Sequence, residues 1–169
     1  MENGDLDHVA RIMGQWGAER PDLDVSPMGL IGRLHRLGGR LNDELRPVFA
    51  AAGLSDGDFD VLAALRRSGP PYALTPGALG DATMVTSGAI TKRIDRLERA
   101  GLVSRTVSET DARSRRVALT DKGRRLVDDL VEKHVANEHR LVSGLSERER
   151  DQLARLLVAW GRALDAVED

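Results

Sequence analysis

The stretch TPGALGDATMVTSGAITKRIDRLERAGLVSRTVSETDARSRRVALT, residues 75–120, decides the fold of this chain. Thr75 followed by Pro76 predicts the start of a short helix. The threonine hydroxyl can cap free backbone amides, and proline is tolerated at the first helical position because an amide there would have no partner within the helix. A second helix is expected over about 86–100, with Gly101 in its C-terminal turn. Two short helices in this order predict a helix-turn-helix.

Helical periodicity divides the second of these helices into two faces. At about 100° per residue, Ile90, Ile94 and Leu97 form one stripe, which must face the core. Outside this stripe, the helix carries small and hydrogen-bonding residues near its N-terminus and cations after them: Ser87, Gly88, Thr91, Lys92, Arg96 and Arg99. This order suits a recognition helix that enters the major groove of DNA.

A basic hairpin follows the second helix. Residues 103–108 and 116–120 alternate apolar and polar side chains, as short strands do, so we expect a two-stranded wing over about 103–120. Arg113 and Arg115 lie between these strands. An arginine-tipped wing fits the narrow, electronegative minor groove.

Positive charge is concentrated around this part of the chain. Residues 86–125 contain eleven Lys or Arg and five Asp or Glu, a local excess of +6, whereas the whole chain carries −2. Such a concentration indicates a surface that binds double-stranded DNA. The alternatives are a solvated helix face with Arg–Glu pairs, and a protein-interaction module that uses the basic patch for an acidic partner.

The flanking segments are predicted to be helical, so the fold class is mainly α with a small β wing (α+β). We expect an extra N-terminal helix and linker over 1–25, a long helix over 26–53 with a kink at Pro47, the winged helix-turn-helix over 54–120 and two helices over 121–169. Capping boxes are predicted at Ser55 with Asp58 and at Ser146 with Glu149, and an extra strand at Tyr72–Leu74.

The long helices carry more apolar surface than one small domain can cover. Leucines recur at three- and four-residue intervals in 26–53 and again in 121–169, among them Leu30, Leu34, Leu37, Leu153, Leu156, Leu157 and Leu164. A second copy of the chain would cover these faces, and a two-fold homodimer would place two recognition helices on the half-sites of a palindromic operator. The alternative is a monomeric helical core.

Composition excludes several classes of protein. The chain has no cysteine, so disulfides, thiolate metal sites and nucleophilic cysteine are ruled out, and its four histidines show no spacing typical of a metal site. We find no apolar run of membrane-spanning length, and the acidic N-terminus is unlike a signal peptide, so we expect a cytoplasmic protein that does not bind membranes. No nucleophile elbow, phosphate loop or paired carboxylates suggest an enzyme.

These features resemble the MarR family of winged-helix regulators over roughly residues 28–167. The most specific motif is the wing signature Asp111-x-Arg113-Ser114, followed by Val117-x-Leu119-Thr120 and Lys122-Gly123. The resemblance implies that Asp111 braces the wing and that Arg113 reaches the minor groove. It also implies recognition-helix contacts from Ser87, Gly88, Thr91 and Lys92.

A narrower resemblance concerns a small-molecule effector. The extra N-terminal helix, with RPDLDVSPMGLIGRL and FDVLAALRRSGPPY after it, is similar to the urate-responsive (HucR and PecS) branch of the family. The resemblance implies a cleft, covered by residues 1–25, in which urate or a similar anion contacts Trp16, Asp60, Arg67 and Arg93. It implies no other cofactor. Some members have tryptophan where this chain has Phe59, a conservative departure.

The chemistry of these residues is compatible with an anion site. Asp60 and Arg67 lie on one stripe of the third helix with alanines between them, and their separation of about 10 Å along the axis predicts that they do not pair without a ligand. Arg93 lies on the flank of the recognition helix nearest its buried stripe. Trp16 could instead be a core anchor, Asp60 and Arg67 surface charges, and Arg93 a phosphate contact. A phenolic compound, a tricarboxylate or no ligand at all remain alternatives to urate.

Overall fold

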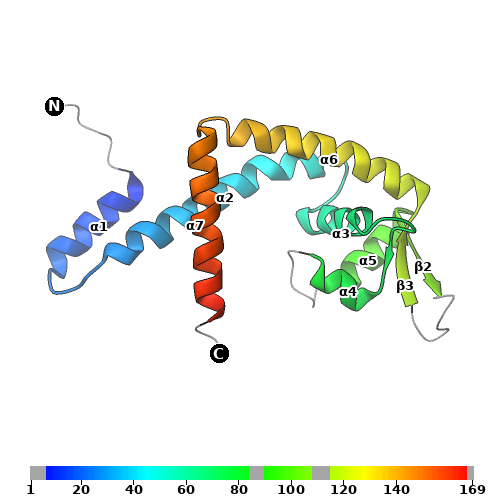
Figure 1. Cartoon of the computed structure of the whole chain (residues 1–169), viewed down its shortest axis with the longest axis horizontal. Coiled ribbons are helices and arrows are strands. Elements are labelled where there is room, and N and C mark those ends of the chain that lie inside the picture. Colours follow the sequence, from blue (N-terminus) through cyan, green and yellow to red (C-terminus); the bar gives the residue numbers. More distant parts are fainter. Residues whose placement is uncertain (1–6, 84–89, 108–114, 167–169) are drawn as a thin grey trace. The chain divides into compact units, whose positions relative to one another are not determined.

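The computed structural model describes residues 7–83, 90–107 and 115–166. The chain divides into two compact units, Met1–Arg46 and Pro47–Asp169. Most of the described residues lie in helices, as Figure 1 shows, and the strands form one small antiparallel sheet. The predicted fold class, mainly α with a small β wing, is confirmed.

Two helices build the first unit. Helix α1 (His8–Glu19) begins at Asp7, whose carboxylate accepts a hydrogen bond from the Ala10 amide at 2.8 Å. Helix α2 (Ser26–Ala50) starts in this unit and packs against α1. A Cβ added at Gly29 would lie 3.0 Å from the sulfur of Met13, and one at Gly32 would lie 3.1 Å from Val9, so these glycines allow the close approach of the two helices.

The last turn of α2 belongs to the second unit. Pro47 lies inside the helix, and α2 ends at Ala50, a few residues before the end predicted at residue 53. The Phe49 ring stacks on Phe59 with 4.3 Å between ring centroids, and both rings contact His134. In a chain with only two phenylalanines, this cluster concentrates the aromatic packing at one place.

The winged helix-turn-helix lies at one end of α6 (Asp121–Leu141) within the second unit (Figure 1). Helix α3 (Asp56–Arg67) begins at the predicted capping box of Ser55 and Asp58 and buries Val61, Leu62 and Leu65. The remaining elements are α4 (Pro76–Asp81), capped by Thr75, α5 (Ile90–Arg99) and the strands β1 (Ala73–Leu74), β2 (Val103–Val107) and β3 (Arg115–Leu119). The strand order is β1-β3-β2, so the predicted extra strand does close the wing sheet.

Helices α6 (Asp121–Leu141) and α7 (Glu147–Asp165) follow the sheet. Thr120 caps α6, and Gly123 in its first turn lies so close to the Leu102 carbonyl group that a Cβ there would be 2.9 Å from the carbonyl carbon. The second predicted capping box, Ser146 with Glu149, starts α7, none of whose residues is buried. Within the described ranges, no helix has the length and hydropathy needed to cross a membrane.

Candidate nucleic-acid interface and effector site

Helix α5 presents the predicted recognition surface. Its apolar stripe is buried as expected, with Ile90, Ile94 and Leu97 at most 3% exposed. Thr91 and Lys92 are exposed, so they are accessible to a partner. Ser87 and Gly88, and the predicted start of this helix near residue 86, lie outside the described residues.

The wing differs from its prediction at one end. Arg115 was placed in the tip of the hairpin, but it is the first residue of β3 and pairs with Val107 of β2. The strand therefore begins one residue earlier than the alternation of side chains suggested, because backbone pairing with β2 continues to that position. Arg115 remains exposed. Asp111 and Arg113 lie outside the described residues.

Arg105 connects the wing to α5, a contact that the sequence analysis missed. Its guanidinium pairs with the carboxylates of Asp95 and Glu98, and its amide donates to Glu98 Oε1 at 3.2 Å. The hydrogen bond that Arg105 donates to Asp95, and the charges of both carboxylates, raise the pKa of Arg105 above its usual value. This cation therefore stabilises the joint between helix and sheet.

Arg96, predicted to contact DNA, pairs with the first turn of α3. It donates from Nε and Nη2 to Asp58 Oδ1 at 3.1 and 2.5 Å, and from Nη2 to Ser55 Oγ at 2.9 Å. The Asp58 side chain is 1% exposed and that of Arg96 is 51% exposed. The capping box was predicted, but its pairing with α5 was not. The three-residue spacing of Arg93 and Arg96 places both on one flank of α5, but it does not indicate a partner that is 38 residues away in the chain.

The prediction that Asp60 and Arg67 do not pair was wrong. Arg67 Nη1 lies 3.9 Å from Asp60 Oδ1, because an arginine side chain on a helix extends back toward the N-terminus and spans much of two turns. Arg67 also donates to the Ala82 carbonyl at the end of α4. The structure thus brings two of the predicted ligand residues together and connects one of them to the helix-turn-helix.

The Arg93 side chain of α5 lies against the same face of α3, at Gly57, which is one helical turn before Asp60. A Cβ added at Gly57 would meet its guanidinium, with Nη2 only 2.7 Å away, so glycine is what admits this side chain. Arg93 Nη1 is buried and has no hydrogen-bond partner among the described residues. This location agrees with the predicted flank of α5 and leaves a buried donor that an anion could satisfy.

Trp16 belongs to the first unit, whereas the other three predicted ligand residues belong to the second. It lies on α1 and is 43% exposed in the chain by itself, so that unit does not bury it as a core anchor. Its participation in an effector site stays a prediction.

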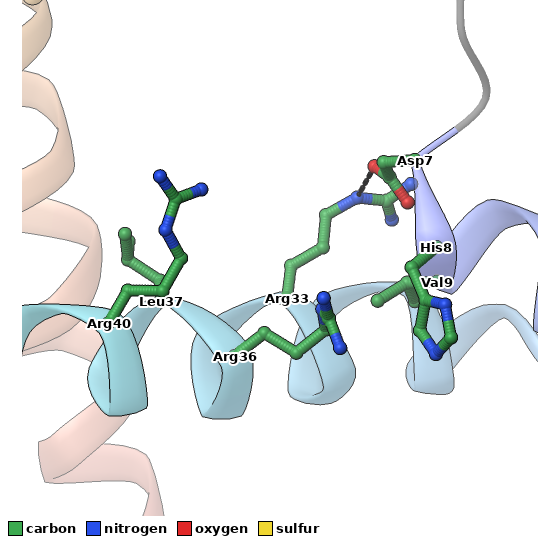
Figure 2. Close-up of a pocket in the computed structure, with 7 residues that line it drawn as sticks. All are labelled: Asp7, His8, Val9, Arg33, Arg36, Leu37 and Arg40. Atoms are coloured by element: carbon green, nitrogen blue, oxygen red, sulfur yellow. Dashed lines mark hydrogen bonds and ion pairs between the residues drawn. The ribbon is translucent and has the colours of Figure 1, made fainter. Parts of the chain in front are cut away.

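The first unit also contains a surface hollow of about 170 Å³, shown in Figure 2. Its lining comes from Asp7, His8, Val9, Arg33, Arg36, Leu37 and Arg40, none of which was predicted as a ligand residue. Arg33 pairs with Asp7 at 2.7 Å. The Ala10 amide, and then Arg33, hold the pKa of the Asp7 carboxyl below its ordinary value.

Comparisons with known proteins agree with this architecture. The MarR family model matches residues 52–114. The HTH-type transcriptional regulator PecS of Dickeya dadantii (strain 3937) is 45% identical over 149 residues, which are 88% of this chain and 90% of PecS. Among solved structures, Bordetella bronchiseptica BpsR, whose DNA binding is regulated by 6-hydroxynicotinic acid, is 26% identical with a TM-score of 0.69, over 77% of this chain and 91% of BpsR. AbsC, a MarR family transcriptional regulator from Streptomyces coelicolor, is 24% identical with a TM-score of 0.73, over 85% of this chain and 98% of AbsC, and shows the shared fold.

Proposed function

Because the chain belongs to the MarR family of winged-helix, DNA-binding transcriptional regulators, we propose that it is a homodimeric repressor that binds a palindromic operator and releases it when a small anion such as urate binds. The single observation that carries the release step is the Nη1 atom of Arg93, which is buried on the α3 side of the recognition helix and has no hydrogen-bond partner among the residues that the structure describes.

The proposed DNA surface consists of α5 and the wing. Thr91 and Lys92 are exposed on α5, where they can contact base edges and phosphates in the major groove, together with Ser87 and Gly88. Arg113 enters the minor groove, Arg115 contacts the backbone beside it, and Asp111 braces the hairpin.

The proposed homodimer is supported by the apolar faces of the long helices. On α2, Leu30, Leu34 and Leu37 are 61%, 41% and 49% exposed, and on α7, Leu156 and Leu164 are 59% and 58% exposed. Exposed apolar side chains of this number on the helices of one chain are typical of an interaction surface. A second copy would bury them and would supply the second recognition helix that a palindromic operator requires.

The proposed effector site is on the α3 face that carries Asp60 and Arg67, below Arg93. An anion here would satisfy Arg93 and would compete with the Asp60 carboxylate for Arg67. Because Arg67 donates to the end of α4 and Arg93 belongs to α5, both helices of the helix-turn-helix respond to occupancy. Release requires only that the ligand bind the DNA-free arrangement more tightly than the DNA-bound one. Trp16 is proposed to stack on the ligand ring.

Urate is the first candidate ligand because the chain resembles PecS and the urate-responsive branch. A second candidate is a hydroxylated heteroaromatic acid, which the regulation of BpsR by 6-hydroxynicotinic acid favours. Both are small planar rings with acidic oxygens, and arginine binds such edges through two parallel hydrogen bonds.

The test is fluorescence anisotropy on a labelled fragment of the DNA upstream of the gene. Urate and 6-hydroxynicotinic acid are titrated separately against the preformed complex, for the wild type and for Arg93→Ala. We expect urate to release the wild type and to leave the variant bound. A wild type that stays bound at saturating concentrations of both compounds would refute this class of effector, and release of the variant at wild-type concentrations would refute the role of Arg93.

A further inference from the structure

Arg96 and Asp58 form a charged contact between the recognition helix and α3 in which both carboxylate oxygens accept hydrogen bonds. The Asp58 carboxylate, 1% exposed, accepts from the Ser55 amide at 2.9 Å and the Ser55 hydroxyl at 2.7 Å through Oδ2. Its Oδ1 accepts twice from Arg96. Because one oxygen holds the cap of α3 and the other holds α5, a single side chain fixes both helix ends in one geometry.

Other contacts between these helices are less directional. The stripe of Ile90, Ile94 and Leu97 packs in the core and decides which face of α5 is buried, but the hydrophobic effect is non-directional and restricts small rotations about the helix axis less than hydrogen bonds do. The two donors of Arg96 converge on one oxygen, and a third contact reaches Ser55 Oγ at 2.9 Å, so they do restrict rotation. The groove-facing residues Thr91 and Lys92 lie on the same helix, and their direction therefore depends on this pair.

We propose that Arg96 is a positioning residue, which contributes to operator binding by holding α5 on the first turn of α3 through Asp58 and not by contacting DNA. This inference rests on the DNA-binding function of the family. If Arg96 left Asp58 for a phosphate, the buried carboxylate would have no counter-charge among the residues that the structure describes, and that cost exceeds the gain from one exposed phosphate contact.

The experiment measures operator affinity of the full-length protein over a range of salt concentrations. The variants are Asp58→Asn, Arg96→Ala, the double variant and Arg96→Lys, and Lys92→Ala serves as the contrasting loss of a cation from the same helix. Circular dichroism and size-exclusion chromatography identify the folded variants. Operator binding by the wild type tests the family function separately.

We expect Asp58→Asn and Arg96→Ala each to weaken operator binding about tenfold, the effect of charge-assisted hydrogen bonds partly screened by solvent. The double variant should lose no more than either single variant, because both changes break one pair. The slope of log affinity against log salt should stay at the wild-type value for all of these, whereas Lys92→Ala should lower it by about 0.9. Arg96→Lys should recover part of the affinity, since lysine keeps the charge without the planar fork.

Three results would overturn the proposal. One is a salt slope that falls in Arg96→Ala as it does in Lys92→Ala. Another is a double variant that loses as much as the two single losses multiplied together. The third is an Asp58→Asn variant that is folded and binds the operator with wild-type affinity. If Arg96→Ala does not fold, Asp58→Asn and Arg96→Lys decide the question, because the first removes the negative charge, the second removes the planar fork, and each leaves the side-chain volume nearly unchanged.

Discussion

Replacing Gly123 with alanine should destabilise the second unit, because the new Cβ would collide with the backbone of Leu102, the residue just before β2. The added Cβ would lie 2.9 Å from the Leu102 carbonyl carbon and 3.2 Å from its Cα, and closer still to the carbonyl oxygen. All three atoms belong to the backbone, so no side-chain rotation can relieve the contact. The first turn of α6 must move away from the start of β2, or the replacement is not accommodated.

The loss of stability can be estimated from the hydrogen bonds that this movement would break. The Gly123 amide donates to the Thr120 cap at 3.0 Å, and the Thr120 amide donates to the Leu102 carbonyl at 3.1 Å. Loss of the cap costs about 1 kcal/mol and loss of the second bond about 1 kcal/mol. Residual overpacking adds about 1–3 kcal/mol, and the better helix propensity of alanine returns about 1 kcal/mol. The free energy of unfolding should therefore fall by about 2–4 kcal/mol.

Urea denaturation followed by circular dichroism, at one fixed protein concentration, measures this loss. Gly80→Ala in α4 is the matched control, because outside its own helix a Cβ there would meet no atom of the described residues within 4 Å. It should raise the free energy of unfolding by about 0.5–1 kcal/mol. The reasoning is refuted if Gly123→Ala is as stable as the wild type, or if the two substitutions shift the midpoint in the same direction.

Other contacts predict changes in effector binding, assembly and titration. Gly57→Ala should displace the Arg93 guanidinium and weaken effector binding in calorimetry about as much as Arg93→Ala; unchanged binding would separate Arg93 from the ligand. Leu156→Glu, on the exposed face of α7, should convert the proposed dimer to a monomer in light scattering, and a dimer of wild-type stability would exclude that face. The α1 cap and Arg33 hold the pKa of Asp7 below 3.8, so its contribution to stability is complete above that value and is lost as the pH falls through the lowered pKa; carboxyl titration by NMR at or above 3.8 would contradict this.

Local signals in the sequence were sufficient for most of the secondary structure. Capping boxes at Ser55 and Ser146 and the Thr75-Pro76 pair start helices where expected, since caps depend on residues three positions apart. The ends of strands were predicted less accurately. Arg115 joins β3 because β2 offers it a backbone partner, and a partner on another strand leaves no signal in the alternation of side chains.

Contacts of long charged side chains could not be predicted in the same way. Axial spacing placed Asp60 and Arg67 too far apart to pair, although an arginine extends along its helix for most of that distance. Likewise the partner of Arg96 is 38 residues away in the chain, and no periodicity connects the two. The glycine that admits Arg93, Gly57, looks from the sequence like any other residue of a first helical turn.

The local excess of positive charge also has a different meaning once these partners are known. Arg105 is held by Asp95 and Glu98, and Arg96 by Asp58, so two of the guanidinium groups that contributed to the excess stabilise the joints of α5. Lys92, in contrast, forms no ion pair with any residue that the structure describes. Counterion release depends on cations that meet phosphates, not on the net charge of a segment. The salt dependence of operator binding should therefore be smaller than the eleven basic residues of this segment would suggest, and Lys92 should account for a larger share of it than any arginine paired within the fold.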